Sequence, residues 1–401
     1  MPVATLLNCA KAVLLAAVAT LGISFPANGQ TFSLAYISSG DVWFLGTINS
    51  APKRLTRSGA AKSPHFSADG TFIAFQENGA IHAVDVPKHE LIDLGAAIEG
   101  NFTWAPQDNM LAVWNNTAVY LFKQRNSWRR AQIIRVAPPA SVVLDVGFDR
   151  DGQRLIVSLR ERGANGGPDE GKIEAVDLRK LDQQSALLVE PGSGFDLYGW
   201  SRDGRTLFFW KDPSFSSSFQ ADGLELWEIS VAQRTVRRVD TMRTLVHRDL
   251  LELSPLGGSL LLTLTAPQDG RETWSSSSIA EVSLLDGGVR VVSAPGTSAL
   301  FPAWSPTGDD IAYVQAPVGR AHMNERRIWV ARRYGKEVRQ LIPGSAFREE
   351  KPIWLSKDTI MFCRIDGTSH ASLWCVRRDA SGLNILADLP SLPNEAFGDY
   401  G

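Results

Sequence analysis

The stretch Phe301-Pro-Ala-Trp-Ser-Pro-Thr-Gly-Asp-Asp310 opens the segment that decides the fold. It is followed by Ile311-Ala-Tyr-Val-Gln315, Arg327-Ile-Trp-Val-Ala-Arg332 and Glu337-Val-Arg-Gln-Leu-Ile342. The apolar runs are short, rich in aromatic and β-branched side chains, and bounded by Gly, Pro or charged residues, as strands are. The segment therefore predicts four consecutive strands, with a tight Pro- and Gly-containing turn after the first.

The same unit recurs along the 401-residue chain. Its landmark is an aromatic or Leu residue at the end of the first strand, found at Phe66, Trp104, Phe148, Trp200, Leu253, Trp304 and Trp354. Successive landmarks are separated by 38, 44, 52, 53, 51 and 50 residues. A period of this size, with four strands in each copy, is typical of a β-propeller. The sequence predicts an all-β fold with residues 30–401 in a single propeller domain.

The blade count follows from the number of copies. Seven complete copies supply 28 strands, and a partial copy from Ser33 to Thr56 adds three. One strand is then missing from an eighth blade, and we expect the C-terminal tail, Glu395 to Tyr400, to supply it. Pairing the two chain ends in one sheet removes an exposed edge. Eight blades are expected, and seven, with one degenerate copy, are the alternative.

A family resemblance rests on the repeated aromatic-Ser-Pro-x-Gly segment and on strands such as Ile311-Ala-Tyr313 and Ile73-Ala-Phe75. These resemble the WD40-like (PD40) repeat of the TolB-like β-propeller family over residues 34–388. The motif also occurs in tricorn-like proteins and in relatives of prolyl oligopeptidase, so it implies a fold and no particular function. TolB itself has an α/β domain before a six-bladed propeller, which the repeats here do not match, so its role in the cell envelope is not implied.

The N-terminus predicts a secretory signal peptide over residues 1–29. A single Lys precedes a mostly apolar run over 12–23, and Ala27-Asn-Gly29 offers small residues at alternate positions. About a dozen apolar residues fall short of the roughly 20 that span a bilayer. We expect a periplasmic or extracellular protein with no stable membrane insertion. The 41 Lys and Arg against 43 Asp and Glu give no electrostatic preference for nucleic acid.

Cys363 and Cys375 lie on two consecutive predicted strands joined by a short loop. A disulfide between them is plausible in an oxidising compartment and would close a small loop of the last repeat. Two buried thiols that pack side by side fit equally well, because Cys is among the most buried residue types. A metal site is not expected, because no second Cys pair and no His at ligand spacing accompany them.

Catalytic motifs are not evident. The sequence has no Gly-x-Ser-x-Gly nucleophile elbow, its six His residues are scattered along the repeats, and no cofactor is expected. The recurring Trp and Phe residues are expected to fill the space between neighbouring sheets. The main expectation is therefore a non-catalytic scaffold, and the alternative is a polysaccharide lyase or hydrolase with its site in the axial channel.

Loop length gives the candidate binding site. The connection between the second and third strands is short in the first copies and long in four consecutive ones: 161–171, 211–223, 266–278 and 316–326. Loops on a rigid scaffold commonly carry binding residues, and exposed aromatic and Arg side chains favour binding. We expect a monomer that binds a protein or peptide partner of the cell envelope through one face. The candidate residues are Arg162, Asp169, Glu170, Phe215, Phe219, Asp222, Arg271, Trp274, Arg320, His322 and Arg326.

Overall fold

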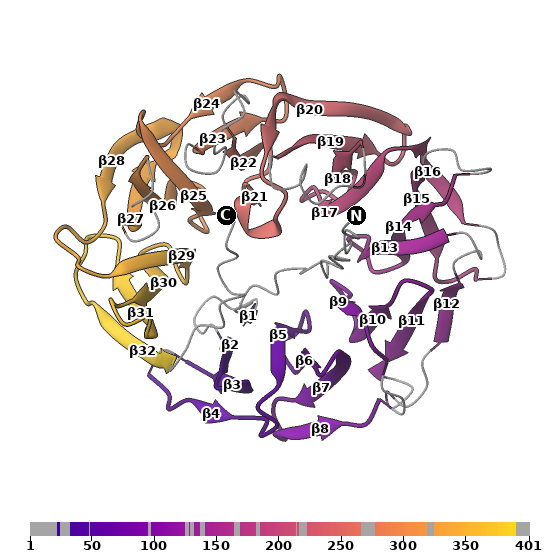
Figure 1. Ribbon diagram of the computed structural model, residues 1–401, viewed down its shortest axis with the longest axis horizontal. Coiled ribbons are helices and arrows are strands. Elements are labelled where there is room, and N and C mark those ends of the chain that lie inside the picture. Colours follow the sequence, from indigo (N-terminus) through magenta and orange to yellow (C-terminus); the bar gives the residue numbers. More distant parts are fainter. Residues whose placement is uncertain are drawn as a thin grey trace, which may run out of the picture.

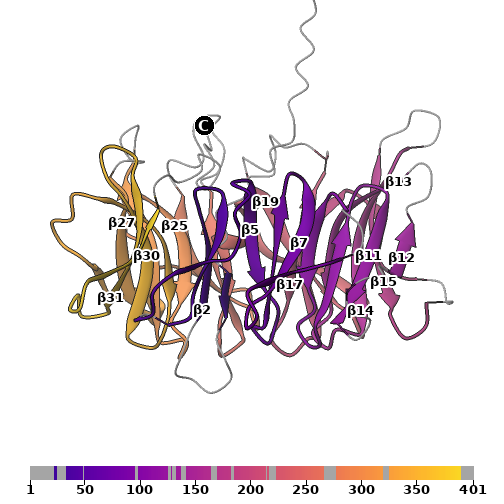
Figure 2. The same ribbon diagram turned by 90° about the horizontal axis from the view of Figure 1, so that it is seen from below.

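The computed structural model describes residues 22–24, 33–47, 49–94, 98–124, 128, 132–136, 141–163, 169–181, 185–213, 215, 223–265, 277–318 and 325–389. These residues form 32 strands and two short 3-10 helices, η3 (Arg248–Leu250) and η6 (Arg333–Gly335). The strands stand around a central axis as a ring of sheets (Figure 1). Seen from the side, they run roughly along the short dimension of the ring (Figure 2).

Each blade of the ring contains four consecutive strands, numbered from the axis outward. Blades 1 to 4 contain β1 (Gly22–Ser24), β2 (Ser33–Ser38), β3 (Asp41–Leu45) and β4 (Lys53–Arg54); β5 (Ala61–Phe66), β6 (Phe72–Glu77), β7 (Ala80–Asp85) and β8 (Glu90–Ile92); β9 (Asn101–Trp104), β10 (Met110–Trp114), β11 (Ala118–Lys123) and β12 (Gln132–Val136); and β13 (Ser141–Phe148), β14 (Arg154–Glu161), β15 (Glu170–Asp177) and β16 (Ala186–Gly192).

The second half of the ring repeats this arrangement. Blades 5 to 8 contain β17 (Gly194–Trp200), β18 (Thr206–Asp212), β19 (Leu224–Ser230) and β20 (Thr235–Thr244); β21 (Leu251–Leu253), β22 (Ser259–Leu264), β23 (Ser278–Ser283) and β24 (Val289–Val291); β25 (Thr297–Trp304), β26 (Asp310–Pro317), β27 (Arg327–Arg332) and β28 (Lys336–Gln340); and β29 (Arg348–Trp354), β30 (Thr359–Ile365), β31 (Ala371–Arg377) and β32 (Asn384–Leu389).

Within the described residues, six blades are separate four-stranded antiparallel sheets, and blades 5 and 6 share one eight-stranded sheet. The connection between these two blades is a single register pair, Thr244 on β20 opposite Leu264 on β22. Counting the shared sheet as two groups of four strands gives eight blades. The all-β propeller expected from the repeat is therefore the observed fold.

Blade 1 is completed from a segment that the sequence did not indicate. β1 pairs with β2, with Ile23 opposite Leu34, and so occupies the axial position of this blade. The tail expected there, Glu395 to Tyr400, lies outside the described residues. The expected source of the strand was wrong because Gly22–Ser24 lies in an apolar run assigned to the signal peptide, and such a run also suits a strand beside the open edge of β2.

The repeated aromatic residues pack between neighbouring blades, as expected. Trp304 and Trp354 are buried. The indole Nε1 of Trp354 donates to the carbonyl oxygen of Ala303 on the preceding blade at 3.1 Å, and that of Trp104 donates to His65 in the same way at 2.9 Å. Trp104 and Trp354 thus each add a hydrogen bond to the apolar contact between sheets.

The turn after each landmark follows from its residue types. In blade 7, Gly308 N donates to Ser305 O at 2.8 Å, and Gly308 has a φ of 74°. Glycine adopts this left-handed conformation without the steric cost that a Cβ atom brings. The Ser-Pro-Thr-Gly sequence therefore closes the tight turn between β25 and β26.

Cys363 and Cys375 are free thiols. Cys363 lies opposite Leu373, and Cys375 lies opposite Met361, so they are diagonal neighbours rather than a directly facing pair. Both are buried in an apolar cluster with Leu34, which joins blade 8 to blade 1. The structure therefore has the packed thiols and not the disulfide. Among the described residues, no helix is both long and apolar enough to cross a membrane.

Candidate active site

The long loops carry five of the predicted binding residues within the described part of the chain. Asp169 accepts a hydrogen bond from Arg160 Nε at 2.7 Å, and the Arg160 guanidinium lies 4.7 Å from the ring centroid of Phe215. Two neighbouring loops therefore meet through an arginine that was not predicted. Arg162 and Glu170 are exposed. The predicted residues outside the described ranges are Phe219, Asp222, Arg271, Trp274, Arg320 and His322.

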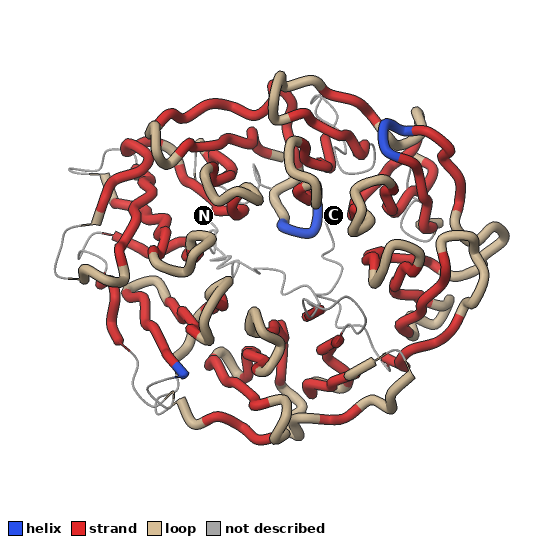
Figure 3. Tube along the Cα trace, turned by 180° about the vertical axis from the view of Figure 1, so that it is seen from behind, coloured by secondary structure: helices blue, strands red, loops and turns tan. Residues whose placement is uncertain are grey.

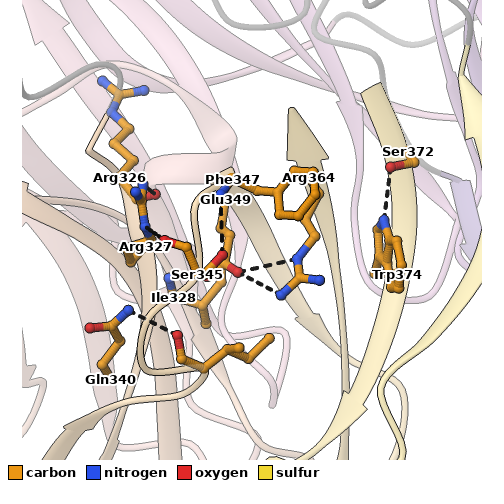
Figure 4. A network of polar contacts seen from close by, with 11 residues as sticks. Arg326, Arg327, Ile328, Gln340, Ser345, Phe347, Glu349, Arg364, Ser372 and Trp374 are labelled. Carbon is orange, nitrogen blue, oxygen red and sulfur yellow. Dashed lines mark hydrogen bonds and ion pairs between the residues drawn. The ribbon is translucent and has the colours of Figure 1, made fainter. Parts of the chain in front are cut away.

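Arg326 is not an exposed binding residue. Only 4% of it is exposed, and its guanidinium pairs with Glu350 Oε1 at 3.0 Å. A second buried pair lies beside it, with Arg364 Nη2 3.1 Å from Glu349 Oε1 (Figure 4). Burial of Arg326 follows from its place at the start of β27, where blades 7 and 8 meet. Its role is to hold these blades together.

The axial channel is lined by the innermost strand of each blade. The position just before the landmark residue is occupied by His65, Thr103, Gly147, Gly199, Glu252, Ala303 and Ile353 in blades 2 to 8. Five of these inner strands contain a bulge, and in three of them a residue other than glycine has a positive φ: Ser63, Phe301 and Lys351, with values of 50°, 53° and 51°. This left-handed conformation is costly for residues other than glycine and often marks functional sites. In blade 8 the bulge places Lys351 beside the channel.

Blade 6 departs from the others at the channel. Its three-residue inner strand β21 is preceded directly by the 3-10 helix η3. Figure 3 shows this helix close to the centre of the ring. Therefore η3 brings His247, Arg248 and Asp249 toward side chains of the other blades.

Arg248 and Asp249 form ion pairs with the inner strands of blades 4 and 8. Lys351 Nζ lies 2.8 Å from Asp249 Oδ2 and 5.5 Å from the ring centroid of Phe301. Arg248 Nη2 lies 3.1 Å from Asp145 Oδ2 on blade 4. Blades 4, 6 and 8 are thus connected through η3.

His247 has a defined tautomer. Its Nδ1 accepts a hydrogen bond from Asp249 N at 3.2 Å. A neutral imidazole that accepts at Nδ1 carries its proton on Nε2. Burial lowers the pKa of His247, and this effect outweighs the opposing charge of Asp249. His247 therefore offers an Nε2–H donor at neutral pH.

His65 is also neutral at pH 7. Enclosure by the channel walls, with a smaller contribution from Arg248, lowers its pKa to about 4. Its side chain is nevertheless exposed to the channel, and its ring lies edge-on to Phe102 at 5.6 Å. For Asp249, burial acts to raise the pKa, but Lys351 and His247 outweigh it and the pKa is lowered. The cluster around η3 therefore contains two neutral imidazoles, one carboxylate and two cations. They belong to His65, His247, Asp249, Arg248 and Lys351.

These channel residues are not among those that sequence reasoning selected. The sequence feature that could have indicated His65 is the residue just before each landmark. Its type differs from copy to copy, from Gly147 to Glu252, whereas the landmark is an aromatic or Leu residue in every copy. For η3, the signal is His247-Arg-Asp249, a polar run where the repeat has an apolar strand. In the described residues, no group of three or more His, Cys, Asp or Glu side chains is arranged to hold a metal ion.

Radial four-stranded sheets around an axial channel define a β-propeller, and the TolB-like repeat resemblance is confirmed at the level of the fold. The chain is similar to dipeptidyl peptidase 4 of Porphyromonas gingivalis, with 10% identity over 93% of this chain and 60% of that one and a TM-score of 0.64. A prolyl endopeptidase matches with 16% identity over 90% of this chain and 55% of its own and a TM-score of 0.53.

A putative TolB from Agrobacterium tumefaciens matches with 12% identity over 73% of this chain and 84% of its own, at a TM-score of 0.37. No protein-family model and no curated protein matches the sequence. This chain spans 55% and 60% of the lengths of the prolyl endopeptidase and the dipeptidyl peptidase. At 10% and 16% identity, the likeness to them establishes the fold alone.

These findings correct the expectation of a non-catalytic scaffold that binds a partner through its long loops. Several structures that match this chain over 90% or more of its length are those of peptidases, which are enzymes, and a eukaryotic initiation factor also matches, with 10% identity over 92% of this chain and 88% of its own and a TM-score of 0.57. The expectation that the protein is not an enzyme is overturned with it. Of the binding residues predicted from loop length, Arg326 and Asp169 are engaged in ion pairs within the ring.

Proposed function

We propose that the protein is a hydrolase that acts on peptides in its axial channel. The observation that carries this proposal is the cluster around η3, where the neutral His65 and His247 lie with the Asp249–Lys351 ion pair. Clusters of perturbed titratable groups in a concave site are typical of active sites. The peptidases among the similar structures support peptides as the substrate class.

His65 is the proposed general base. With its lowered pKa, it is unprotonated at neutral pH and exposed to the channel. It takes a proton from a water molecule as the water oxygen attacks the carbonyl carbon of a peptide bond. Transfer of a proton by a positioned imidazole typically accelerates such a step by about 10² to 10⁴.

His247 and Lys351 are the proposed stabilisers of the oxyanion. The carbonyl oxygen becomes negatively charged when water adds, and the Nε2–H of His247 and the ammonium of Lys351 are suitable donors to it. As the intermediate collapses, the C–N bond breaks and protonated His65 returns the proton to the leaving amine. The products are a carboxylic acid and an amine.

The test measures hydrolysis of a panel of short peptides by the purified protein. His65→Ala should lower kcat about 100-fold or more, because the general base is lost. His89→Asn is the matched control, since His89 is exposed in a turn with a φ of 57°, which Asn tolerates. Equal loss in both variants, or no hydrolysis of any peptide by the unmodified protein, would contradict the proposal.

We also propose that the protein is secreted, with residues 1–29 removed as a signal peptide. The apolar run before Ala27-Asn-Gly29 supports this. Cleavage after Gly29 would remove β1 and leave the axial edge of β2 unpaired. Mass spectrometry of the secreted protein would identify the mature N-terminus.

A further inference from the structure

We infer that a pocket in the channel wall between blades 3, 4 and 5 binds the C-terminal residue of a peptide through its carboxylate. The pocket has a volume of about 360 Å³. Arg248 of η3 lines it, so it adjoins the cluster described above. The inference rests on the proposed function, because it takes the ligand to be a peptide substrate. It adds that the pocket would recognise the C-terminal end of that peptide.

The pocket exists because two adjacent blades have glycine at the channel position. Gly147 and Gly199 stand where blades 2 and 6 have His65 and Glu252. A Cβ atom added at either glycine would meet no atom within 4 Å, so both face open space. Because Gly147 and Gly199 have no side chains, this part of the channel wall has room for a ligand.

The charge of the pocket suits an anion. Arg150, Arg202 and Arg248 line it. Arg248 is already paired with Asp145, but Arg150 and Arg202 form no ion pair within the described part of the chain. The one carboxylate of the lining, Asp149, is engaged by Arg154 at 2.9 Å. Two exposed guanidinium groups are therefore available, and guanidinium binds carboxylate through paired hydrogen bonds.

The rest of the lining favours an apolar ligand body over a sugar. Trp104, Phe148, Tyr198 and Trp200 contribute aromatic surface. Apart from Asp149, the described lining has no carboxylate or carboxamide side chain to accept hydrogen bonds from sugar hydroxyls. An apolar or aromatic residue that ends in a carboxylate matches both the charge and the walls.

The pocket also lies beside the proposed base. Trp104, which lines it, donates its indole N–H to the carbonyl oxygen of His65 at 2.9 Å. The charge of Arg248 acts on both the pocket and the His65 ring. A peptide whose last residue fills the pocket could therefore extend toward His65.

The test is calorimetric binding of N-acetyl-L-phenylalanine, with N-acetyl-L-phenylalaninamide as the uncharged match. The acid should bind at least about 10-fold more tightly than the amide, the ratio that one charge-assisted contact supplies. Gly147→Leu should weaken binding of the acid at least about 10-fold by filling the pocket. Gly192→Leu is the control, since Gly192 is exposed and a Cβ there also meets no atom within 4 Å.

A second variant keeps the inference falsifiable if Gly147→Leu misfolds. Arg202→Gln should weaken binding of the acid and leave binding of the amide unchanged. Equal affinity for acid and amide, or full affinity in a folded Gly147→Leu protein, would overturn the inference. Tighter binding of D-glucuronate than of the acid would also overturn it and assign the pocket to a sugar. Because binding is measured without turnover, failure of the proposed hydrolysis would leave this result standing.

Discussion

Glu252 on β21 and His65 on β5 occupy the same position of the inner strand, and burial has opposite effects on their pKa values. It raises the pKa of Glu252 to about 7 and lowers that of His65. In both cases the neutral form is favoured, because a low-dielectric environment penalises charge whatever its sign. Glu252 Oε2 also accepts a hydrogen bond from Trp304 N, which holds the carboxyl group in place.

Replacing Glu252 should change how stability depends on pH. Its folded pKa lies above the ordinary value of 4.5, so the native state binds the proton more tightly. The resulting stabilisation is fully present below pH 4.5 and is lost as the pH rises through about 7. Glu252→Gln keeps a hydrogen-bond acceptor and should be more stable than the unmodified protein at pH 8 by about 1 to 2 kcal/mol.

Urea unfolding at pH 5 and pH 8 measures this difference. Glu90→Gln, on the exposed strand β8, should have no effect at either pH. A Glu252→Gln protein with the same pH dependence as the unmodified one would show that the carboxyl group is not held neutral.

At the scale of elements, the start of β29 is held by buried charges. Glu349 and Arg364 are 0% and 4% exposed, and Glu349 Oε2 also accepts from Ile328 N at 3.1 Å. The Arg364 guanidinium lies over Phe347 and Trp374, at 5.1 and 4.9 Å from their ring centroids. The network shown in Figure 4 thus ties β27, β29 and β30 to one another.

Removing one member of the buried Glu349–Arg364 pair should lower the free energy of unfolding more than removing both members. Arg364→Met leaves the Glu349 carboxylate buried without its counter-ion, which typically costs about 3 to 5 kcal/mol. The double variant Glu349→Gln with Arg364→Met should recover most of that loss. Urea unfolding compares them, and Arg179→Met, which removes an exposed pair with Asp177, should unfold like the unmodified protein. Equal stability of the single and double variants would contradict the prediction.

The strands could be predicted from the sequence because the landmark residues have the same packing role in every blade. Trp104, Trp304 and Trp354 each fill the same gap between sheets, so the pattern repeats. β1 could not be predicted, because an apolar strand and an apolar signal segment have the same composition. Nor could the site be predicted, because His65 and Lys351 lie on different blades, at positions where the repeats differ, and both come near Asp249 only when the ring forms.

At the scale of the whole molecule, the ring is closed by apolar contact between blade 1 and blade 8. Leu34 and Tyr36 of β2 pack in one cluster with Cys363, Leu373 and other residues of the last blade. Only side chains connect these two blades within the described residues, since their sheets are separate. The two thiols therefore lie at the seam where the ring closes.

Thiol labelling should report opening of this seam. Burial raises the pKa of Cys363 to about 12 and also raises that of Cys375, so neither reacts readily while buried. Leu34→Ala removes apolar contact at the seam, at a cost of about 2 to 5 kcal/mol, and should accelerate labelling of both thiols by a disulfide reagent.

Leu261→Ala is the matched control, because Leu261 is equally buried in a different cluster between blades 6 and 7. It should cost similar stability and accelerate labelling less. Peptide mapping assigns the labelled residues and separates them from Cys9. If the two variants label at the same rate, the seam does not open ahead of the rest of the ring.

The sheet shared by blades 5 and 6 has a mechanical consequence. The pairing of Thr244 with Leu264 makes these two blades one continuous sheet that resists sliding, whereas the other blades are separate sheets, joined by side-chain packing and isolated main-chain hydrogen bonds that permit small shear. η3 follows β20 directly and is anchored to this stiff sector. If the channel widened, Asp249 would stay with blades 5 and 6 while Lys351 moved with blade 8, so that the Asp249–Lys351 pair would be stretched.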